Sequence, residues 1–522
     1  MHNKSLKGNT VMIIDFGSQF TQLIARRIRE MHVFSTIIPF SNLTKDHLDN
    51  VGAIILSGSP TTTTYNEHST LPNEIFSSGI PILGICYGQH LVAVQSSGKV
   101  QKSEQREFGR TVITVLSDSQ ILEGISLTYD NTFNAWMSHG DKVTEIPDTF
   151  KVVASSDGAP YAVFEDNDKL IYGIQFHPEV AHTDNGSKIL ENFVLKIAGI
   201  SPEWTMKSYL SESVERIKHQ VGSDHVVCGL SGGVDSAVTA IMVHKAIGSQ
   251  LTCIFVDTGL LRKKESEQVV SLFKDQYNIP LIHINAADQF FKALQGVTDP
   301  EKKRKIIGNL FVEIFDTQAN NIGSEVKFLA QGTLYPDVVE SFSVRGGPSE
   351  TIKSHHNVGG LPENMKLQLV EPLRELFKDE VRALARELEI DSRFTDRHPF
   401  PGPGLAIRIM GEVTPEKVNT LQEVDALFIQ AICDEGLYNR IWQAFAVLLP
   451  VCTVGVMGDG RTYENVCALR AITSSDGMTA DFFHFDMDFL AKISIQIVNN
   501  VKGVNRVVYD VTSKPPATIE WE

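Results

Sequence analysis

The sequence predicts an α/β protein with two successive parallel-sheet α/β domains followed by a small α+β domain. Short apolar runs alternate with helical patterns over 11–94, the same alternation restarts at His225, and the last quarter of the chain mixes helical and strand patterns. The 522 residues also exceed the roughly 250–300 at which a single core stops growing. We therefore expect three domains, at 1–199, 200–397 and 398–522.

In the first domain, short runs of apolar and β-branched residues predict strands, with helical segments such as Phe20–Ile28 crossing between the early ones. A helical pattern over 188–198 leads to Pro202, which ends the run, and we place the domain boundary near residue 200. The expected strands are 11–15, 52–56, 82–85, 111–115 and 170–176, all in one sheet.

The second domain begins with a strand–helix–strand unit, predicted at 225–230, 234–247 and 251–256. A single helix is expected over 375–388. The three prolines of 397–404 exclude both a helix interior and a central strand, so a second boundary lies there.

Composition excludes several function classes. The 63 Asp and Glu against 47 Lys and Arg give a formal net charge of −16, which argues against a broad basic surface for nucleic acid or anionic lipid. No stretch of about 18 uninterrupted apolar residues occurs, and the amino terminus lacks the apolar run of a secretory signal. The six cysteines form no C-x-x-C pair, which disfavours a zinc, iron–sulfur or disulfide framework. We expect a cytoplasmic protein with no nucleic-acid and no membrane partner.

Cys86 follows the predicted strand 82–85 directly and stands between Gly84 and Gly88, where a helix begins. Small flanking residues allow a sharp strand-to-helix turn that exposes the thiol at the edge of the sheet, and the helix amino terminus favours a thiolate. A buried cysteine packed as a small apolar residue is the commoner case. The motif therefore needs support from elsewhere in the domain.

That support comes from His177 and Glu179, which end a predicted strand two residues apart, so their side chains leave the same face. Glu179 can then orient the imidazole of His177. Together with Cys86 they have the residue types of a nucleophile, a proton-transferring base and an orienting carboxylate.

These motifs resemble those of the class I glutamine amidotransferases, which have a G-x-C-x-G elbow and a later H-P-E. The resemblance covers about 11–199. It implies that Cys86 attacks the side-chain amide of glutamine, with His177 and Glu179 as its partners. It also implies that Gly58 and Tyr87 supply backbone N–H groups to the oxyanion hole.

Two positions depart from the pattern of that family. Ser59 stands where glycine is usual, and His90 stands where glutamine is usual. Both lie near the expected glutamine site, so a weak or inactive glutaminase domain remains an alternative.

The segment 230–236, Leu-Ser-Gly-Gly-Val-Asp-Ser, lies between a predicted strand and a predicted helix. Successive backbone N–H groups and the helix amino terminus form an anion cradle there, and a lysine of the Walker A type is absent from the segment. The segment resembles the S-G-G-x-D-S motif of the ATP pyrophosphatases. That resemblance implies binding of ATP with Mg²⁺, the metal held in part by Asp235, and it assigns ATP contacts to Ser231, Gly232, Gly233, Val234, Asp235, Ser236, Ala237 and Asp257.

Further segments resemble the GMP synthases, a family in which an amidotransferase and an ATP pyrophosphatase are fused. They are 299–308, 353–360, 397–404, 456–463 and 512–522. The resemblance implies glutamine, ATP and xanthosine 5′-phosphate (XMP) as substrates and homodimerisation through the third domain. It assigns XMP contacts to Arg304, Asp459, Lys514, Ile519 and Glu520.

Composition alone would make the basic run 302–305 a solvated helix face. Two further alternatives stay open: an ATP pyrophosphatase that amidates a different acceptor, and a GMP synthase that uses free ammonia because its glutaminase domain is impaired.

Overall fold

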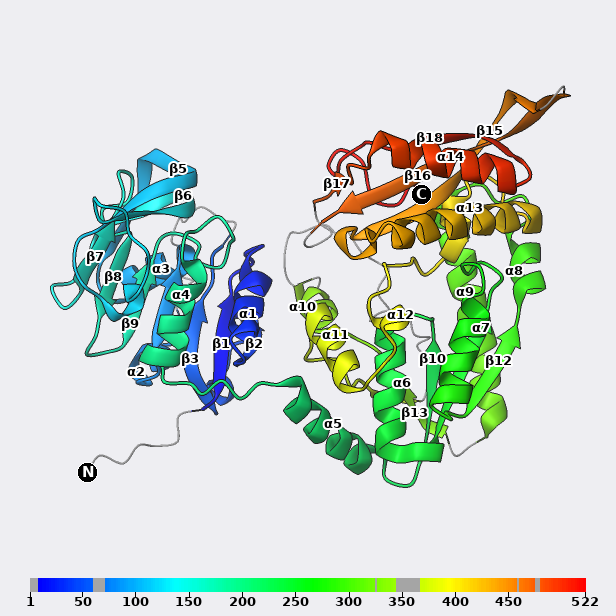
Figure 1. The fold of residues 1–522 in the computed structure, drawn as a ribbon. Helices are drawn as coiled ribbons and strands as arrows, with labels where there is room; N and C mark the ends of the chain where they lie inside the picture. Colours follow the sequence, from blue (N-terminus) through cyan, green and yellow to red (C-terminus); the bar gives the residue numbers. More distant parts are fainter. Residues whose placement is uncertain (1–7, 60–70, 324–325, 344–366, 458–459, 475–478) are drawn as a thin grey trace. The chain divides into compact units, whose positions relative to one another are not determined.

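The computed structural model describes residues 8–59, 71–323, 326–343, 367–457, 460–474 and 479–522 (Figure 1). The chain forms two compact units. Unit 1 consists of 1–209 with 336–356, and unit 2 consists of 210–335 with 357–522.

Unit 1 contains a nine-stranded sheet with the order β2-β1-β3-β4-β9-β8-β7-β5-β6. From β2 to β9 neighbouring strands are parallel, and from β9 to β6 they are antiparallel. The strands are β1 Thr10–Asp15, β2 Phe34–Pro39, β3 Val51–Leu56, β4 Ile82–Ile85, β5 Lys99–Val115, β6 Thr132–Glu145, β7 Lys151–Ser155, β8 Val163–Asp166 and β9 Ile171–Ile174.

The helices of unit 1 pack apolar faces on this sheet. In α1, Ile24, Ala25 and Ile28 recur at helical spacing and are fully buried. Leu91 of α3 belongs to the same core as Ile54 of β3. The helices are α1 Thr21–Glu30, α2 Asn73–Ser77, α3 Tyr87–Gln95 and α4 Gly186–Glu191, which continues as a π-helical turn over Asn192–Ile197.

Unit 2 begins with a five-stranded, fully parallel sheet of order β12-β11-β10-β13-β14. Chain order reverses between β10 and β13, and in open α/β sheets ligands bind beyond the carboxyl ends of the strands at such a point. The strands are β10 His225–Leu230, β11 Leu251–Asp257, β12 Leu281–Asn285, β13 Val326–Ala330 and β14 Gln368–Val370. The accompanying helices are α5 Met206–Val221, α6 Val234–Ile247, α7 Glu265–Val270, α8 Ala287–Leu294, α9 Pro300–Ile322, α11 Lys378–Glu387 and α12 Ser392–Thr395. The helix α10 Tyr335–Ser343 belongs to unit 1 from Pro336 onward.

The carboxyl-terminal part of unit 2 has a separate small sheet. β16 pairs antiparallel with β15 and β17 and parallel with β18. Two helices, α13 and α14, accompany this sheet (Figure 1). The bounds are α13 Pro415–Asp434, β15 Gln443–Met457, β16 Gly460–Thr473, β17 Asp481–Phe482, α14 Met487–Asn500 and β18 Val504–Tyr509.

One hydrophobic core joins the two parts of unit 2. Val227 and Ile254 of the parallel sheet belong to the same cluster of buried side chains as Leu421 and Phe428 of α13 and Leu469 of β16. The carboxyl-terminal part is therefore fixed against the parallel sheet by continuous apolar packing.

The predicted α/β class with two parallel-sheet regions and a small α+β region is confirmed, and the bounds of β10 and α6 match the predicted ones. The helix predicted over 375–388 begins only at Lys378, because the Glu380 carboxylate accepts the Phe377 N–H at 2.9 Å and caps the helix there. No helix in the described part of the chain combines the length and hydrophobicity needed to cross a bilayer.

Candidate active sites

Cys86 lies in a strained turn between β4 and α3. Its φ is 53° and its ψ is −105°, an unusual conformation for a residue other than glycine. Both neighbouring glycines are needed for close approach. A Cβ on Gly84 would lie 2.4 Å from the Gly88 carbonyl oxygen, and one on Gly88 would lie 2.2 Å from that of Leu56. The expected nucleophile elbow is present.

The structure brings His177 and Glu179 to Cys86. The His177 Nδ1 lies 2.7 Å from Glu179 Oε1, and Cys86 lies close enough to the ring to favour its charged form. Burial disfavours a charged imidazole, but the Glu179 carboxylate and Cys86 outweigh it and raise the pKa of His177 to about 10. The site therefore favours a charged imidazolium beside the Cys86 thiol, and a histidine placed in this way activates a cysteine nucleophile.

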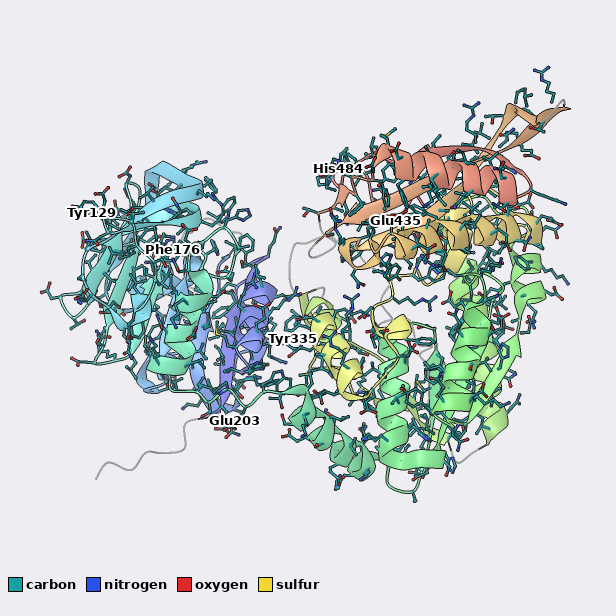
Figure 2. All side chains as sticks on the ribbon, in the orientation of Figure 1. Tyr129, Phe176, Glu203, Tyr335, Glu435 and His484 are labelled. Atoms are coloured by element: carbon teal, nitrogen blue, oxygen red, sulfur yellow. The ribbon has the colours of Figure 1, made fainter. Side chains whose placement is uncertain are left out.

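Residues that sequence reasoning missed hold the backbone of the triad. The Thr183 hydroxyl donates to the His177 carbonyl at 2.6 Å and accepts from the Trp136 N–H at 3.0 Å. Arg27 Nε donates to the Glu179 carbonyl at 3.0 Å. Phe176, labelled in Figure 2, is fully buried and anchors the start of this segment. Thr183 lies only six residues after His177, but the local sequence pattern does not indicate that its hydroxyl contacts the His177 carbonyl.

The two expected oxyanion-hole residues lie beside the triad. A Cβ on Gly58 would lie 3.6 Å from the His177 ring and 3.2 Å from Ser18 Oγ. Glycine at this position therefore avoids crowding these two side chains. Tyr87 is the first residue of α3, where backbone N–H groups have no partner within the helix. Ser59 is not among the described non-glycine residues with positive φ. The serine therefore does not cause the backbone strain that a residue other than glycine has at positive φ.

His90 and Gln89 both form hydrogen bonds inside unit 1. Gln89 Nε2 donates to the Tyr161 carbonyl at 2.8 Å, and His90 Nε2 lies 2.9 Å from Gln175 Oε1. Burial, with a further contribution from His139, lowers the pKa of His90 to about 4. His90 is therefore neutral at physiological pH.

In unit 2, the predicted phosphate loop joins the end of β10 to the start of α6, at the reversal of strand order. Gly232 has a φ of 76°, and Gly233 is the residue before the first turn of α6. The Ser231 and Ser236 hydroxyls lie 3.0 Å apart across the loop, and Ser236 also donates to the Gly233 carbonyl at 3.1 Å. The loop thus presents hydroxyls and helix amino-terminal N–H groups, which bind phosphate well.

Lys378, at the start of α11, is a site residue that the sequence interpretation missed. Its Nζ lies 2.6 and 2.5 Å from the two carboxylate oxygens of Asp235. Asp257, at the end of β11, accepts the Gly259 N–H at 2.9 Å. Lys378 lies 143 positions from Asp235, so only the fold could reveal this pair.

The donor chemistry at Asp235 suits Mg²⁺, which is usually held by one or two carboxylates together with substrate phosphates and water. Within the described residues, no group of three or more His, Cys, Asp or Glu side chains could hold a metal by itself. A magnesium ion at Asp235 would take its other ligands from water or from a bound nucleotide.

The residues assigned to XMP lie around the terminal segment of the chain. Arg304 Nη2 donates to the Glu522 carbonyl at 2.6 Å, and Ile519 O accepts from Arg470 Nε at 2.8 Å. Glu520 accepts a two-pronged hydrogen bond from Arg408, at 3.0 and 2.7 Å. Lys514 pairs through its backbone with Ala480, and Asp459 lies outside the described residues. The fold thus brings Arg304 and Glu520 to one segment.

Three family models match successive parts of the chain: glutamine amidotransferase class-I over residues 12–197, NAD synthase over 206–330 and the GMP synthase C terminal domain over 430–521. A glutamine-hydrolyzing GMP synthase of Bartonella bacilliformis is 59% identical over 515 residues, which cover 98% of this chain and 99% of that protein. The chain belongs to the glutamine-hydrolyzing GMP synthase family. Proteins of the same name from Rhizobium johnstonii and Brucella suis are each 58% identical, with the same coverage.

Membership of this family confirms the resemblance that the motifs predicted. The glutamine amidotransferase model matches the part of the chain with the Cys86 site, and the NAD synthase model matches the part with the phosphate loop. The two domain boundaries, and the roles given to single residues in glutamine, ATP and XMP binding, stay predictions.

Proposed function

We propose that this chain converts XMP to GMP with ATP and glutamine, releasing AMP, pyrophosphate and glutamate. The observation that carries the proposal is one chain with a Cys–His–Glu triad in unit 1 and a phosphate loop at the strand-order reversal of unit 2. The identity of 59% along 98% of the chain to a named GMP synthase supports the same activity.

In unit 1, the Cys86 thiolate attacks the side-chain amide carbon of glutamine. His177 returns a proton to the departing nitrogen, so that ammonia leaves and a glutamyl thioester remains. Water then releases glutamate and regenerates the thiol. The N–H groups at Gly58 and Tyr87 stabilise the negative oxygen formed in both steps.

In unit 2, the XMP base oxygen attacks the α-phosphate of ATP, and pyrophosphate leaves into the Ser231–Ser236 loop. Mg²⁺, when bound, offsets charge on the phosphate oxygens. Lys378 would pair with phosphate once Asp235 takes the metal. Ammonia then displaces AMP from the adenylated base and yields GMP.

The acceptor site is proposed at the terminal segment, with Arg304 and Lys514 on the phosphate and Glu520 on donors of the ribose or base. The Arg408 fork fixes the direction of the Glu520 carboxylate, since a bidentate guanidinium pair is geometrically specific. Asp459 and Ile519 complete the proposed set.

We also propose that the protein is a cytoplasmic homodimer formed through residues 398–522. Exposed apolar side chains on the hairpin of β15 and β16 support an interface: Val454 is 46%, Val456 78% and Tyr463 71% exposed. All six cysteines are free, as the reducing cytoplasm would keep them.

Substitution of Cys86 by Ala tests the assignment of the two sites. Glutamine-dependent GMP formation should be lost, while GMP formation from ammonium salts should persist, because the phosphate loop is untouched. Assays with XMP and ATP would measure both rates. Equal loss of both rates would contradict separate sites, and no GMP from either nitrogen source in the wild type would exclude XMP as the acceptor.

A further inference from the structure

An ion pair between Arg397 and Glu265 contacts the backbone of the phosphate loop. Arg397 Nη1 donates to the Gly232 carbonyl at 3.1 Å, and Arg397 Nη2 lies 2.6 Å from Glu265 Oε1. A Cβ on Gly232 would itself lie only 3.1 Å from that carboxylate oxygen. The position of Gly232 thus depends on a carboxylate from α7 and a guanidinium that follows α12.

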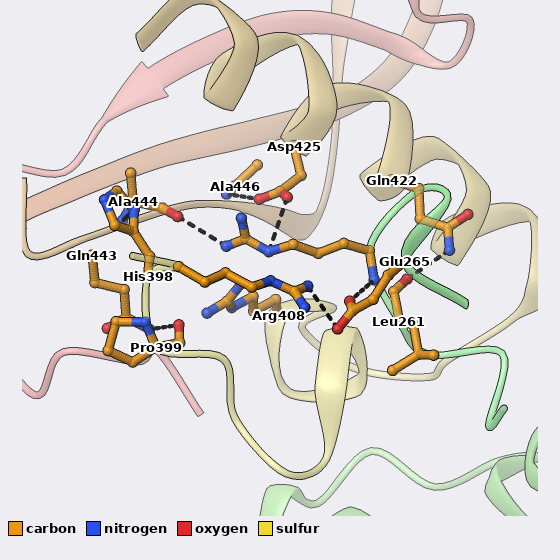
Figure 3. Close-up of polar contacts among 12 residues, drawn as sticks. Leu261, Glu265, His398, Pro399, Arg408, Gln422, Asp425, Gln443, Ala444 and Ala446 are labelled. Atoms are coloured by element: carbon orange, nitrogen blue, oxygen red, sulfur yellow. Dashed lines mark hydrogen bonds and ion pairs between the residues drawn. The ribbon is translucent and has the colours of Figure 1, made fainter. Parts of the chain in front are cut away.

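Glu265 continues the contacts away from the loop. Its second oxygen accepts the Arg262 N–H at 2.8 Å. The Arg262 side chain then donates to the Ala444 carbonyl of β15 at 3.1 Å and lies 3.5 Å from Asp425 of α13 (Figure 3). Residues just after β11 are thereby tied to the carboxyl-terminal part of unit 2.

From Arg262 the contacts reach the proposed acceptor site. The Phe400 ring has the Arg262 guanidinium 5.3 Å and the Arg408 guanidinium 5.0 Å from its centroid. Arg408 forms an ion pair with the Glu520 carboxylate. In parallel, Gln443, next to Ala444 on β15, donates to Glu520 at 2.8 Å. We name the series Arg397, Glu265, Arg262, Phe400, Arg408 and Glu520 the loop-to-tail contact chain.

The charged members of this chain are largely withdrawn from water. The side chain of Glu265 is 2% exposed, that of Arg262 12% and that of Arg408 0%. A buried charge that loses its partner costs far more than an exposed one, so each member strongly resists moving alone. A shift of the phosphate loop would therefore also act on the surroundings of Glu520.

We propose that Arg262, Glu265 and Arg397 are positioning residues that couple binding of the ATP phosphates to binding of the acceptor nucleotide. The inference rests on the proposed function, because it takes the Ser231–Ser236 loop and Glu520 as parts of the two substrate sites. It adds that the sites are energetically linked, and it names the side chains that link them.

The test measures the dissociation constant of XMP by calorimetry on the full chain, with and without saturating Mg²⁺ and α,β-methylene-ATP, which cannot be cleaved at the α–β bond. In the wild type we expect the analogue to tighten XMP binding about 5-fold or more, within the usual range of coupling between sites. The same factor must appear when the order of addition is reversed.

Arg262→Lys and Arg397→Lys keep the charge but cannot make both contacts of the guanidinium. In each variant we expect the ATP analogue to tighten XMP binding by less than about 2-fold, because the contacts that couple the two sites are broken. Binding of XMP alone should stay close to the wild-type value, which a general loss of structure would not allow. If either variant fails to fold, Phe400→Leu, which removes the ring between the two guanidiniums and leaves every charge, replaces it.

Lys263→Gln is the matched control. Lys263 is the neighbour of Arg262 and pairs with Glu423 of α13 at 2.6 Å, but this pair is exposed and touches neither site. Its coupling factor should equal that of the wild type. Wild-type coupling in the Arg262 and Arg397 variants, or no tightening in the wild type, would overturn the proposal. A wild type that binds the ATP analogue but never XMP would refute the acceptor of the proposed function, and the coupling with it.

Discussion

Two buried histidines of unit 1 show how neighbours decide the state of a single residue. His177 and His90 are each 3% exposed, yet the pKa of the first is raised to about 10 and that of the second is lowered to about 4. Burial acts alike on both. The difference arises because His177 faces the Glu179 carboxylate, whereas His90 faces the uncharged Gln175 amide.

Replacing Glu179 by Gln should therefore disable the glutaminase without disturbing the fold. The neutral amide no longer offsets burial, so the pKa of His177 falls and the imidazolium beside Cys86 becomes rarer. We expect glutamine hydrolysis to slow by about 10²–10⁴-fold, as when the orienting acid of a triad is neutralised. Glutamate release measures this effect, and an unchanged ammonia-dependent rate is the control. A loss below tenfold would show that Glu179 is not the orienting carboxylate.

Replacing His90 by Gln should change how stability depends on pH. The pKa of His90 is about 4 in the folded state and near 6.5 when unfolded, so between these values only the unfolded chain takes up the proton. Stability is therefore lost as the pH falls through this window, by about 2 kcal/mol at pH 5. The variant should lack this loss. Thermal unfolding of both proteins at pH 7 and pH 5 measures it, and equal losses would contradict a neutral buried His90.

The sequence predicted Cys86, His177 and Glu179 because their chemistry is concentrated in short motifs. Lys378 and Arg397 were not predicted as site residues. Lys378 contacts Asp235 and Arg397 contacts Gly232, and in each pair the two residues are more than a hundred positions apart in the sequence. A lone basic residue in a helix or connection carries no local signal of such a contact. Pairings of this kind are set by topology, which periodicity does not reveal.

Among the structural elements, the turn between β4 and α3 leaves no room for an added Cβ at either of its glycines. Gly88→Ala would place a Cβ 2.2 Å from the Leu56 carbonyl oxygen, and neither backbone can move without displacing β3 or Cys86. Overpacking of this kind costs about 1–3 kcal/mol. We expect a lower melting temperature and slower alkylation of Cys86 by iodoacetamide.

Gly308→Ala is the control for that substitution. Gly308 lies inside α9, and a Cβ there would meet nothing within 4 Å. Alanine should stabilise the helix by about 1 kcal/mol, because glycine is the poorer helix former. If both alanine variants behaved alike, steric conflict at the elbow would not be the cause.

Element bounds were predictable where turn chemistry is local and not where side chains reach back. Glycines and a polar turn delimit β10 and α6, and the predicted bounds agree with the structure. The start of α11 depends on Glu380 capping the Phe377 N–H, and the π-helical turn after α4 has no signature in the hydrophobic pattern. Of the nine strands in the sheet of unit 1, only β1, β3, β4, β5 and β9 correspond to predicted strands, and the order of the strands was not predicted.

For the molecule as a whole, the net charge of −16 does not prevent the binding of nucleotides. In the proposed function, anionic groups are held locally, by a glycine-containing loop, Lys378 and the basic residues around the terminal segment. The charge remains an argument against a broad nucleic-acid surface. The sequence predicts three domains, and the hydrophobic cores of the two units give a way to test that division.

Calorimetric unfolding should show two main transitions, because one core joins 210–335 to the carboxyl-terminal part while unit 1 has its own core. Leu421→Ala, in α13, removes a fully buried side chain at a cost of about 2–5 kcal/mol. It should lower the same transition that Mg²⁺ and the ATP analogue raise, although α13 lies beyond the predicted boundary at 398. Ile54→Ala in β3 should lower only the other transition. A third transition, sensitive to Leu421→Ala and insensitive to the ATP analogue, would instead show that residues 398–522 unfold as a domain of their own.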